Sequence, residues 1–288
     1  MIYVSGDIDK HLAKAPMLPA DSIIYDLHEP ISPQFKDRGR EKLRTAIEIS
    51  QFRGQEKIVR VNRLDSPWID DDLRMASEIE IDAVLFTGIE TGNQLEEAVT
   101  RLDAAGGTHL PVMAMIETPM AVLNVREIAG TSDRLVLLAV SNANLSASMR
   151  LPASRDRTGL FTSLAQVVLA GRAYGLSVID GAHLDITEPH ACEYACRQSR
   201  DFGFDGKAVI HPIQLAYTND AFSPKPKDVQ KKRAIIEVIE QAQQEGRSYA
   251  VMESRLLQPS ELEAAKRCIA HFEAIERRNA EFHKEPSV

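Results

Sequence analysis

The strongest constraint on the fold is a regular alternation of short apolar runs with longer amphipathic segments. The runs are apolar at nearly every residue, which is typical of parallel strands that helices cover on both faces. They span residues 2–4, 22–27, 57–62, 83–86, 112–117, 134–140, 177–180 and 206–212. Eight strand–helix units of this kind predict an α/β fold of the TIM (β/α)8 barrel type.

An open, doubly wound nucleotide-binding sheet is the main alternative for such a pattern. The length of 288 residues allows one large barrel or two smaller domains. No Gly-x-Gly-x-x-Gly segment follows a predicted strand, and no phosphate-loop lysine motif occurs. The barrel is therefore the better interpretation.

The composition changes after Phe222. Residues 223–227 contain two prolines and two lysines, which predicts a linker, and residues 228–245 and 261–279 form charged amphipathic patterns. We therefore divide the chain into a (β/α)8 barrel over residues 1–222 and a C-terminal helical arm over residues 223–288. The arm is expected to pack on the barrel or on a neighbouring subunit, with a solvated helical tail as the alternative.

Charge and hydropathy limit the partners. The net charge of -8 and the pI of about 5.6 argue against a nucleic-acid partner, because phosphate binding requires a basic face. No apolar run approaches the ~20 residues that span a bilayer, and no basic-then-apolar leader is present. We expect no membrane partner and a cytoplasmic location. Cys192, Cys196 and Cys268 are interpreted as reduced packing residues, since no further ligand completes a metal site.

One strand ends on a carboxylate. The apolar run from Val112 continues to Glu117, and the chain then turns at Pro119 into a helical pattern. A carboxylate in this position is how a barrel enzyme delivers a catalytic or metal-binding group to the C-terminal face of its strands. Polar residues at the ends of other predicted strands are expected at the same face: Asp26, His28, Glu29, Arg60, Asn62, Asn144, Asp180 and His211.

Several acids around one arginine suit a divalent metal and an anionic substrate. Mg²⁺ takes one or two carboxylates together with water and substrate oxygens. Arg60 would hold a substrate carboxylate through its planar fork, and metal and arginine together would stabilise an enolate as a carbon–carbon bond breaks. The structural alternative is that Asp26 and Asp180 cap loops and that Arg60 pairs with an acid in the barrel.

A set of segments also carries a family resemblance: Arg60–Asn62, Ile116–Thr118, Asp180–Gly181, Gly203–Gln214, Ala221–Pro224 and, more loosely, Val4–Asp7 and Tyr25–Leu27. Over nearly the whole chain the sequence resembles the citrate lyase β-subunit-like (CitE-like) group of the HpcH/HpaI aldolase family. The Gly203–Gln214 segment is the most specific of these matches.

The resemblance implies a TIM barrel with a C-terminal helical extension in a homotrimer or hexamer. It implies cleavage of acyl-CoA thioesters of the citryl, malyl or citramalyl type, with CoA as part of the substrate and Mg²⁺, Mn²⁺ or another divalent metal as cofactor. Carried over by position, Arg60 would hold the substrate carboxylate, Glu117 would bind the metal and Asp26 would lie near the metal waters. Asn144 stands at the second metal position.

Further site residues follow from the same region of the sequence. His28 and Glu29 are candidate catalytic groups, His28 as a general base or a neutral metal ligand and otherwise as an ordinary loop histidine. Asn62 and Lys36 are candidate substrate-binding residues, since Lys36 begins a basic helical segment that could attract a CoA-like anion.

The sequence also departs from the family pattern at four positions. Asn144 stands in place of an aspartate, His28-Glu29 in place of a Glu-Asp pair and Gly88 in place of a lysine, and Gln258 lies where an acid is expected in the arm. Asn144 offers no charge to a metal, so Mg²⁺ affinity should fall. The first hypothesis is a divergent metal-dependent carbon–carbon lyase or aldolase. The alternatives are a catalytically silent barrel that binds a small carboxylate or thioester or serves as an assembly subunit, and an HpaI-type aldolase acting on 2-keto acids.

Overall fold

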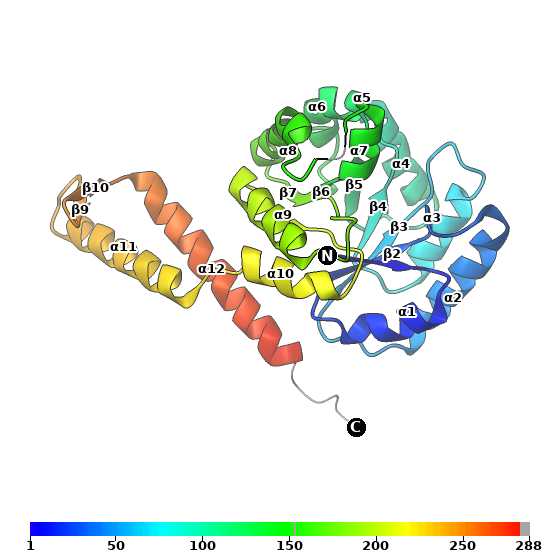
Figure 1. Cartoon of the computed structure of the whole chain (residues 1–288), viewed down its shortest axis with the longest axis horizontal. Helices are drawn as coiled ribbons and strands as arrows, with labels where there is room; N and C mark the ends of the chain where they lie inside the picture. The colour runs from blue at the N-terminus through cyan, green and yellow to red at the C-terminus, as the bar shows by residue number, and fades with distance from the viewer. Residues whose placement is uncertain (153, 283–288) are drawn as a thin grey trace. The chain divides into compact units, whose positions relative to one another are not determined.

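The chain forms an eight-stranded parallel barrel surrounded by helices (Figure 1). The computed structural model describes residues 1–152 and 154–282. The strands pair in sequence order: β1 (Ile2–Ser5), β2 (Ser22–Asp26), β3 (Glu56–Arg60), β4 (Ala83–Phe86), β5 (Val112–Ile116), β6 (Leu135–Val140), β7 (Ser177–Asp180) and β8 (Gly206–Lys207). A parallel bridge between Ile2 and Val209 joins the last segment to the first. The predicted TIM-barrel fold is confirmed.

Helices follow the strands and cover their outer face. They are α1 (Asp9–Lys14), α2 (Lys36–Ile49), α3 (Ile69–Glu78), α4 (Gly92–Ala104), α5 (Pro119–Leu123), α6 (Val125–Ala129), α7 (Asn142–Ser148), α8 (Phe161–Ala173), α9 (Pro189–Phe202) and α10 (Ile213–Phe222). Short 3-10 turns lie at Ala15–Met17, Pro33–Phe35 and Thr158–Leu160.

The eighth strand is shorter than predicted. The ladder between β7 and β8 ends at the pair Asp180–Lys207, so the predicted strand 206–212 is wrong in its extent. The physical reason is local: the backbone N–H groups of Ile210 and His211 donate to the side-chain oxygen of Gln214, at 3.0 and 3.3 Å. That side chain turns the segment into the start of α10.

Two apolar layers hold the barrel together. The outer layer lies between strands and helices, and the inner one fills the barrel with ten buried residues: Ile24, Ile58, Ala83, Leu85, Met113, Met115, Leu137, Ala139, Ile179 and Ala208. Side chains alternate between the two faces of a strand. Four inner-layer residues are each followed, two positions later, by a polar residue that faces the same way. These polar side chains therefore lie at the C-terminal end of the barrel: Asp26 after Ile24, Arg60 after Ile58, Thr87 after Leu85 and Glu117 after Met115.

Residues after Phe222 form a separate compact unit. It contains α11 (Pro226–Gln244), a hairpin of β9 (Ala250–Met252) and β10 (Arg255–Leu257), and α12 (Pro259–Phe282) around a small core that includes Ile235 and Leu257. Glu253 and Ser254 turn the hairpin with φ values of 49° and 62°. This hairpin was not predicted from the sequence.

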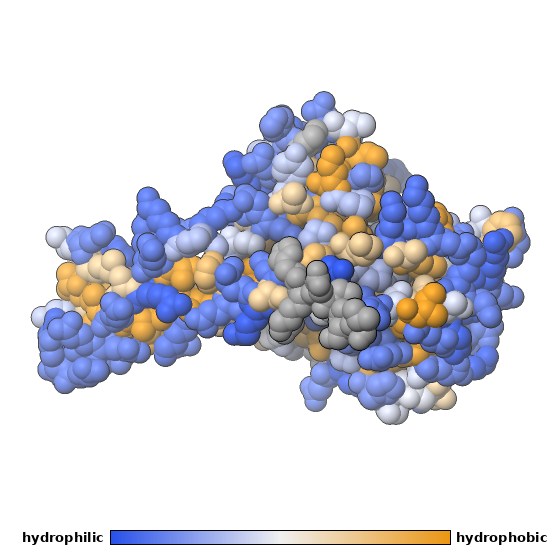
Figure 2. Space-filling model, turned by 90° about the horizontal axis from the view of Figure 1, so that it is seen from below, coloured by the Kyte–Doolittle hydropathy of each residue, from blue (hydrophilic) through white to orange (hydrophobic). Residues whose placement is uncertain are grey.

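The face of the C-terminal unit that Figure 2 shows is mostly hydrophilic, with apolar patches along it. Residues 283–288, which the predicted arm includes, lie outside the described residues, and what the arm packs against stays a prediction. Among the described helices, none combines the length and the apolar character that a bilayer span requires.

Candidate active site

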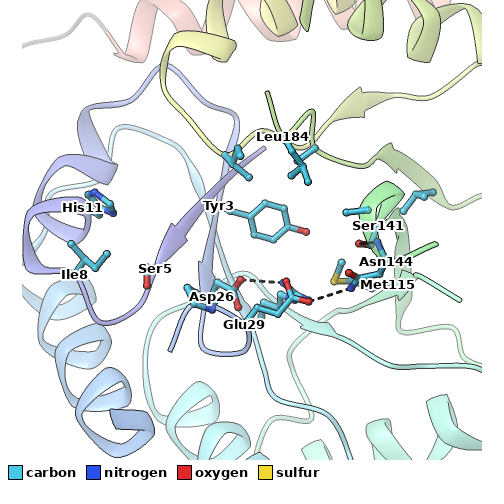
Figure 3. A pocket seen from close by; sticks show the side chains of 16 residues that line it. Tyr3, Ser5, Ile8, His11, Asp26, Glu29, Met115, Ser141, Asn144 and Leu184 are labelled. Atoms are coloured by element: carbon cyan, nitrogen blue, oxygen red, sulfur yellow. Dashed lines mark hydrogen bonds and ion pairs between the residues drawn. The ribbon is translucent and has the colours of Figure 1, made fainter. Parts of the chain in front are cut away.

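A cavity of about 440 Å³ opens at the C-terminal end of the barrel (Figure 3). Its polar lining is formed mainly by Asp26, Glu29, Arg60, Ser141 and Asn144, which follow or end β2, β3 and β6. Apolar side chains at Ile8, Leu184 and Ile210 line it as well. The cavity is therefore polar on one part of its wall and apolar on another.

Arg60 is the centre of the polar lining. It is 3% exposed and ends β3, where register places it opposite Asp26 of β2. Its Nη1 donates to Asp26 Oδ2 at 3.1 Å and to Glu29 Oε2 at 3.4 Å, and its Nη2 donates to Thr87 Oγ1 at 3.3 Å. Its buried Nε–H has no hydrogen-bond partner among the described residues. The guanidinium is thus fixed in place while part of its donor capacity is unused.

Glu117 lies just after β5, as the sequence predicts, and is 5% exposed. Its carboxylate oxygens lie 3.0 and 3.1 Å from Thr87 Oγ1, which connects Glu117 to Arg60. Burial raises the pKa of Glu117, and the positive charge of Arg60 opposes this. The next residue, Thr118, caps α5 by accepting a hydrogen bond from the Ala121 N–H, so the chain direction after Glu117 is fixed.

Glu29 and Asn144 link two sides of the cavity. Asn144 Nδ2 donates to Glu29 Oε1 at 3.2 Å, and the two residues come from the loop after β2 and from α7. Burial opposes ionisation of Glu29, but the charge of Arg60 and the hydrogen bond from Asn144 outweigh it, and the pKa is lowered. Glu29 is therefore an ionised, half-exposed carboxylate in the cavity.

Lys36 and Asn62 do not reach the cavity. Lys36 is 4% exposed, and its Nζ donates to the carbonyls of Leu27 and His28 and to Asn62 Oδ1, at 2.7, 2.5 and 2.7 Å. Asn62 in turn donates to Asp72 Oδ2 at 2.6 Å. All three ammonium protons are engaged inside the protein. This geometry corrects the prediction that both residues bind substrate: they brace the loop that carries Glu29.

His28 is not among the described residues that line the cavity. Its Nδ1 lies 3.4 Å from Asn62 Oδ1, and its backbone N–H donates to Asp26 Oδ1 at 2.8 Å. Burial and the charge of Arg60 lower its pKa. The geometry favours a neutral loop histidine over a general base or a metal ligand.

Asp180 belongs to a different cluster. Ile179 faces the barrel interior, so Asp180 faces outward, where Lys207 Nζ at 2.6 Å, Arg157 Nη1 at 2.7 Å and Asn142 Nδ2 at 2.9 Å donate to it. Ser199 Oγ donates to it as well. Its inclusion in the predicted ring was wrong because the alternation of β7 turns it behind the barrel wall. His211 is exposed and accepts a hydrogen bond from the Ile213 N–H. It is not among the described residues that line the cavity.

The side-chain donors at the site show how far Mg²⁺ would fit there. Among the described residues, no group of three or more His, Cys, Asp or Glu side chains is arranged to hold an ion. Hard oxygen donors are nevertheless present: the Glu117 and Glu29 carboxylates and Asn144 Oδ1, which accepts no hydrogen bond from a described residue. Mg²⁺ needs only one or two carboxylates when water and substrate complete its shell. The donor types fit this ion, with one charge fewer than an aspartate at position 144 would give. Glu29 and Asn144 are among the described residues that line the cavity, whereas Glu117 is not and joins the cluster through Thr87.

Two residues near the site were missed by the sequence analysis. Tyr3 of β1 packs against the inner layer and lines the cavity, and its inward phase on β1 was the available signal. Arg63 lies over Gly88, whose φ is +71°, and its Nη1 would be 2.7 Å from a Cβ added there. Gly88, which stands where the family has a lysine, thus leaves room for Arg63 from the loop after β3. This contact joins two loops, so the sequence of either loop alone does not reveal it.

The comparisons with known proteins agree on one family. The HpcH/HpaI aldolase/citrate lyase family model matches residues 1–212. A (3S)-malyl-CoA thioesterase of Cereibacter sphaeroides is 32% identical over 275 residues, covering 96% of this chain and 94% of that protein. A citrate lyase subunit beta of Leuconostoc mesenteroides is 28% identical over 265 residues, covering 89% and 87%.

Solved structures show the same fold. A citrate lyase from Burkholderia xenovorans superposes with a TM-score of 0.83 at 16% identity, covering 98% of this chain and 96% of that one. The CitE protein of Mycobacterium tuberculosis, in complex with magnesium, acetoacetate and coenzyme A, superposes with a TM-score of 0.76 at 23% identity, covering 94% and 97%.

Proposed function

Because the chain belongs to the HpcH/HpaI aldolase/citrate lyase family, we propose that it is a divalent-metal-dependent lyase that cleaves a carbon–carbon bond in a hydroxyacyl-CoA thioester. Substrates of the citryl, malyl and citramalyl type are the first candidates. One relative is named as a citrate lyase subunit beta, which supports a lyase, and another as a (3S)-malyl-CoA thioesterase, which supports a CoA-thioester substrate.

The charge balance of the site carries the proposal. Among the described residues, Arg60 is the arginine that lines the cavity, and three carboxylates act on it: Asp26, Glu29 and Glu117. Arg63 adds a second positive charge near Glu117. A substrate carboxylate bound to Arg60 would add a fourth negative charge in a buried place. Unpaired buried charges are costly, so a divalent cation beside the substrate restores the balance.

The roles of the chain's own groups follow from their contacts. Arg60 orients the substrate carboxylate, which replaces Glu29 at the longest of the arginine's hydrogen bonds. Glu29 then accepts the substrate hydroxyl proton on its carboxylate oxygen, while the electron pair of the breaking carbon–carbon bond moves to the thioester enolate. Asp26 holds Arg60. Glu117 and Asn144 would hold Mg²⁺ or Mn²⁺, which supplies positive charge that stabilises developing negative charge.

The test is a product analysis with citryl-CoA, malyl-CoA and citramalyl-CoA, each with and without Mg²⁺. The lyase predicts a shorter acyl-CoA and a keto acid, with the yield dependent on added metal. Asp180→Asn serves as a control for a buried acid outside the cavity, and Glu117→Gln tests the metal ligand. Metal-independent turnover, or full activity of Glu117→Gln, would contradict the proposal.

A second candidate is hydrolysis of the same thioester, which the similarity to the malyl-CoA thioesterase favours. Its products would be free CoA and the intact hydroxy acid, so the same assay separates the two reactions. Binding of these thioesters without turnover would indicate a silent barrel, and cleavage of 4-hydroxy-2-keto acids alone would indicate an HpaI-type aldolase. The homotrimeric or hexameric state and the cytoplasmic location stay predictions.

A further inference from the structure

Tyr3 is placed at the middle of the candidate site. It comes from β1, packs against the inner apolar layer and lines the cavity together with Arg60. Figure 3 shows its hydroxyl pointing toward the side of the cavity where Ser141 and Asn144 lie. The Tyr3 ring therefore lies near Arg60, and its hydroxyl points to the side of the site that carries Ser141 and Asn144.

The ring is held but the hydroxyl is not. Arg60 Cζ lies 5.8 Å from the centre of the Tyr3 ring, close enough for a cation–π contact. No described residue forms a hydrogen bond with the Tyr3 hydroxyl, whereas tyrosine hydroxyls in buried places usually find a partner. The Tyr3 side chain is only half-buried and lines the cavity, so water or a bound ligand in the cavity supplies the partner.

The hydroxyl is also a donor at any physiological pH. Burial raises the pKa of Tyr3 to about 12; the positive charge of Arg60 opposes this, and the carboxylates of Asp26, Glu117 and Glu29 add to it. Tyr3 therefore remains a neutral phenol when the carboxylates around it are ionised. It can offer a proton to an oxygen without adding charge to the site.

We propose that Tyr3 is a specificity-determining residue whose hydroxyl donates a hydrogen bond to the keto or hydroxyl oxygen next to the carboxylate that Arg60 binds. The proposal rests on the proposed function, in which Arg60 holds a substrate carboxylate. The carbon chain beyond that carboxylate would run past the Tyr3 ring toward Asn144. The hydroxyl then meets the first oxygen along this path and not the carboxylate itself.

The test uses two small carboxylates that differ in this oxygen. Pyruvate has a keto oxygen beside its carboxylate, and acetate has none. Ligand-observed NMR titrations at fixed Mg²⁺ concentration measure both affinities for the wild type, Tyr3→Phe and Tyr25→Phe. Tyr25 is the matched control, because it is a buried tyrosine of the neighbouring strand that faces the outer layer.

Tyr3→Phe should weaken pyruvate binding about tenfold and leave acetate binding within about twofold, as expected for one lost hydrogen bond. Tyr25→Phe should change neither. Equal losses of affinity for both ligands would show that Tyr3 acts through Arg60. An unchanged pyruvate affinity would show that the hydroxyl makes no contact with the ligand. Either result overturns the role of Tyr3 but leaves the proposed function standing. A wild type that binds neither ligand would overturn the proposed function and this inference with it.

Discussion

Two clusters of buried charges lie near the C-terminal ends of the strands, and they are built for different purposes. The outer cluster lies behind β7 and is centred on Asp180, which is fully buried. Lys207, Arg157 and Asn142 donate hydrogen bonds to the Asp180 carboxylate. Beside the cavity, three acids act on Arg60, two of which line the cavity, and Arg60 Nε has no described partner. Two cations surround one buried acid in the outer cluster, which marks a structural cluster even though Asn142 Oδ1 has no described partner there. An excess of acids over cations beside a cavity marks a candidate site for a cation and an anionic ligand.

The largest effect is expected in the outer cluster. Lys207→Met leaves the Asp180 carboxylate without its shortest buried cation contact, and removal of one partner from a buried pair typically costs about 3–5 kcal/mol. Chemical denaturation should show this loss of unfolding free energy. The fraction that stays folded should keep its activity; a large loss of activity per folded molecule would break the distinction between the two clusters.

A pair of matched arginine substitutions separates the clusters by function. Arg60→Lys keeps the charge but loses the planar fork, so kcat/KM should fall by about 10²–10³, as for loss of a preorganised charge contact. Arg157→Lys makes the same change beside Asp180 and should leave kcat/KM unchanged. Steady-state kinetics with the substrate found by product analysis measures both. Equal losses for the two variants would contradict the assignment.

The two clusters should respond to pH with opposite sign. Burial opposes ionisation of Asp180, but Lys207 and Arg157 outweigh it and hold its pKa well below the usual range, so its contribution to stability is present above the unfolded pKa and is lost as the pH falls. Glu117 has a raised pKa because it is buried, so its contribution is present in acid and is lost as the pH rises through the folded pKa.

At pH 7 without metal, Asp180→Asn should therefore lower Tm, and the difference should shrink toward pH 3. Glu117→Gln should raise Tm at pH 7, because it removes a buried carboxylate whose pKa is raised, and the gain should vanish in acid. Differential scanning calorimetry between pH 3 and 8 measures both. A destabilised Glu117→Gln protein at pH 7 would show that Glu117 is already paired.

The smallest effect concerns the amide at the edge of the cavity. Asn144→Asp adds one carboxylate to the donor set and should strengthen Mn²⁺ binding by about tenfold, within the range by which ligand changes alter metal affinity. Electron paramagnetic resonance titration of free Mn²⁺ measures it. Asn142→Asp is the control, because Asn142 donates to Asp180 in the outer cluster. An unchanged Mn²⁺ affinity in Asn144→Asp would remove Asn144 from the metal site.

The sequence predicted most of the barrel and part of the site, for a physical reason. The alternation of apolar runs with amphipathic segments located the strands. The polar residues at the strand ends indicated that Asp26, Arg60 and Glu117 lie together, as they do in the structure. For Asp180 and Lys36, the sequence did not reveal the direction in which the side chain points. Asp180 shares the outward phase of Val178, and Lys36 is drawn inward by three acceptors from two loops, which depends on contacts distant in sequence.

With a substrate carboxylate bound, the acids around Arg60 outnumber the positive charges of Arg60 and Arg63, and we propose that a divalent metal at Glu117 makes up the difference. The most direct test of this proposal is an electron paramagnetic resonance titration of Mn²⁺ into the wild type and Glu117→Gln, with and without pyruvate. The account predicts one Mn²⁺ per chain, tighter with pyruvate, and binding at least about tenfold weaker in Glu117→Gln. No binding by the wild type at millimolar Mn²⁺, or equal binding by both proteins, would contradict it.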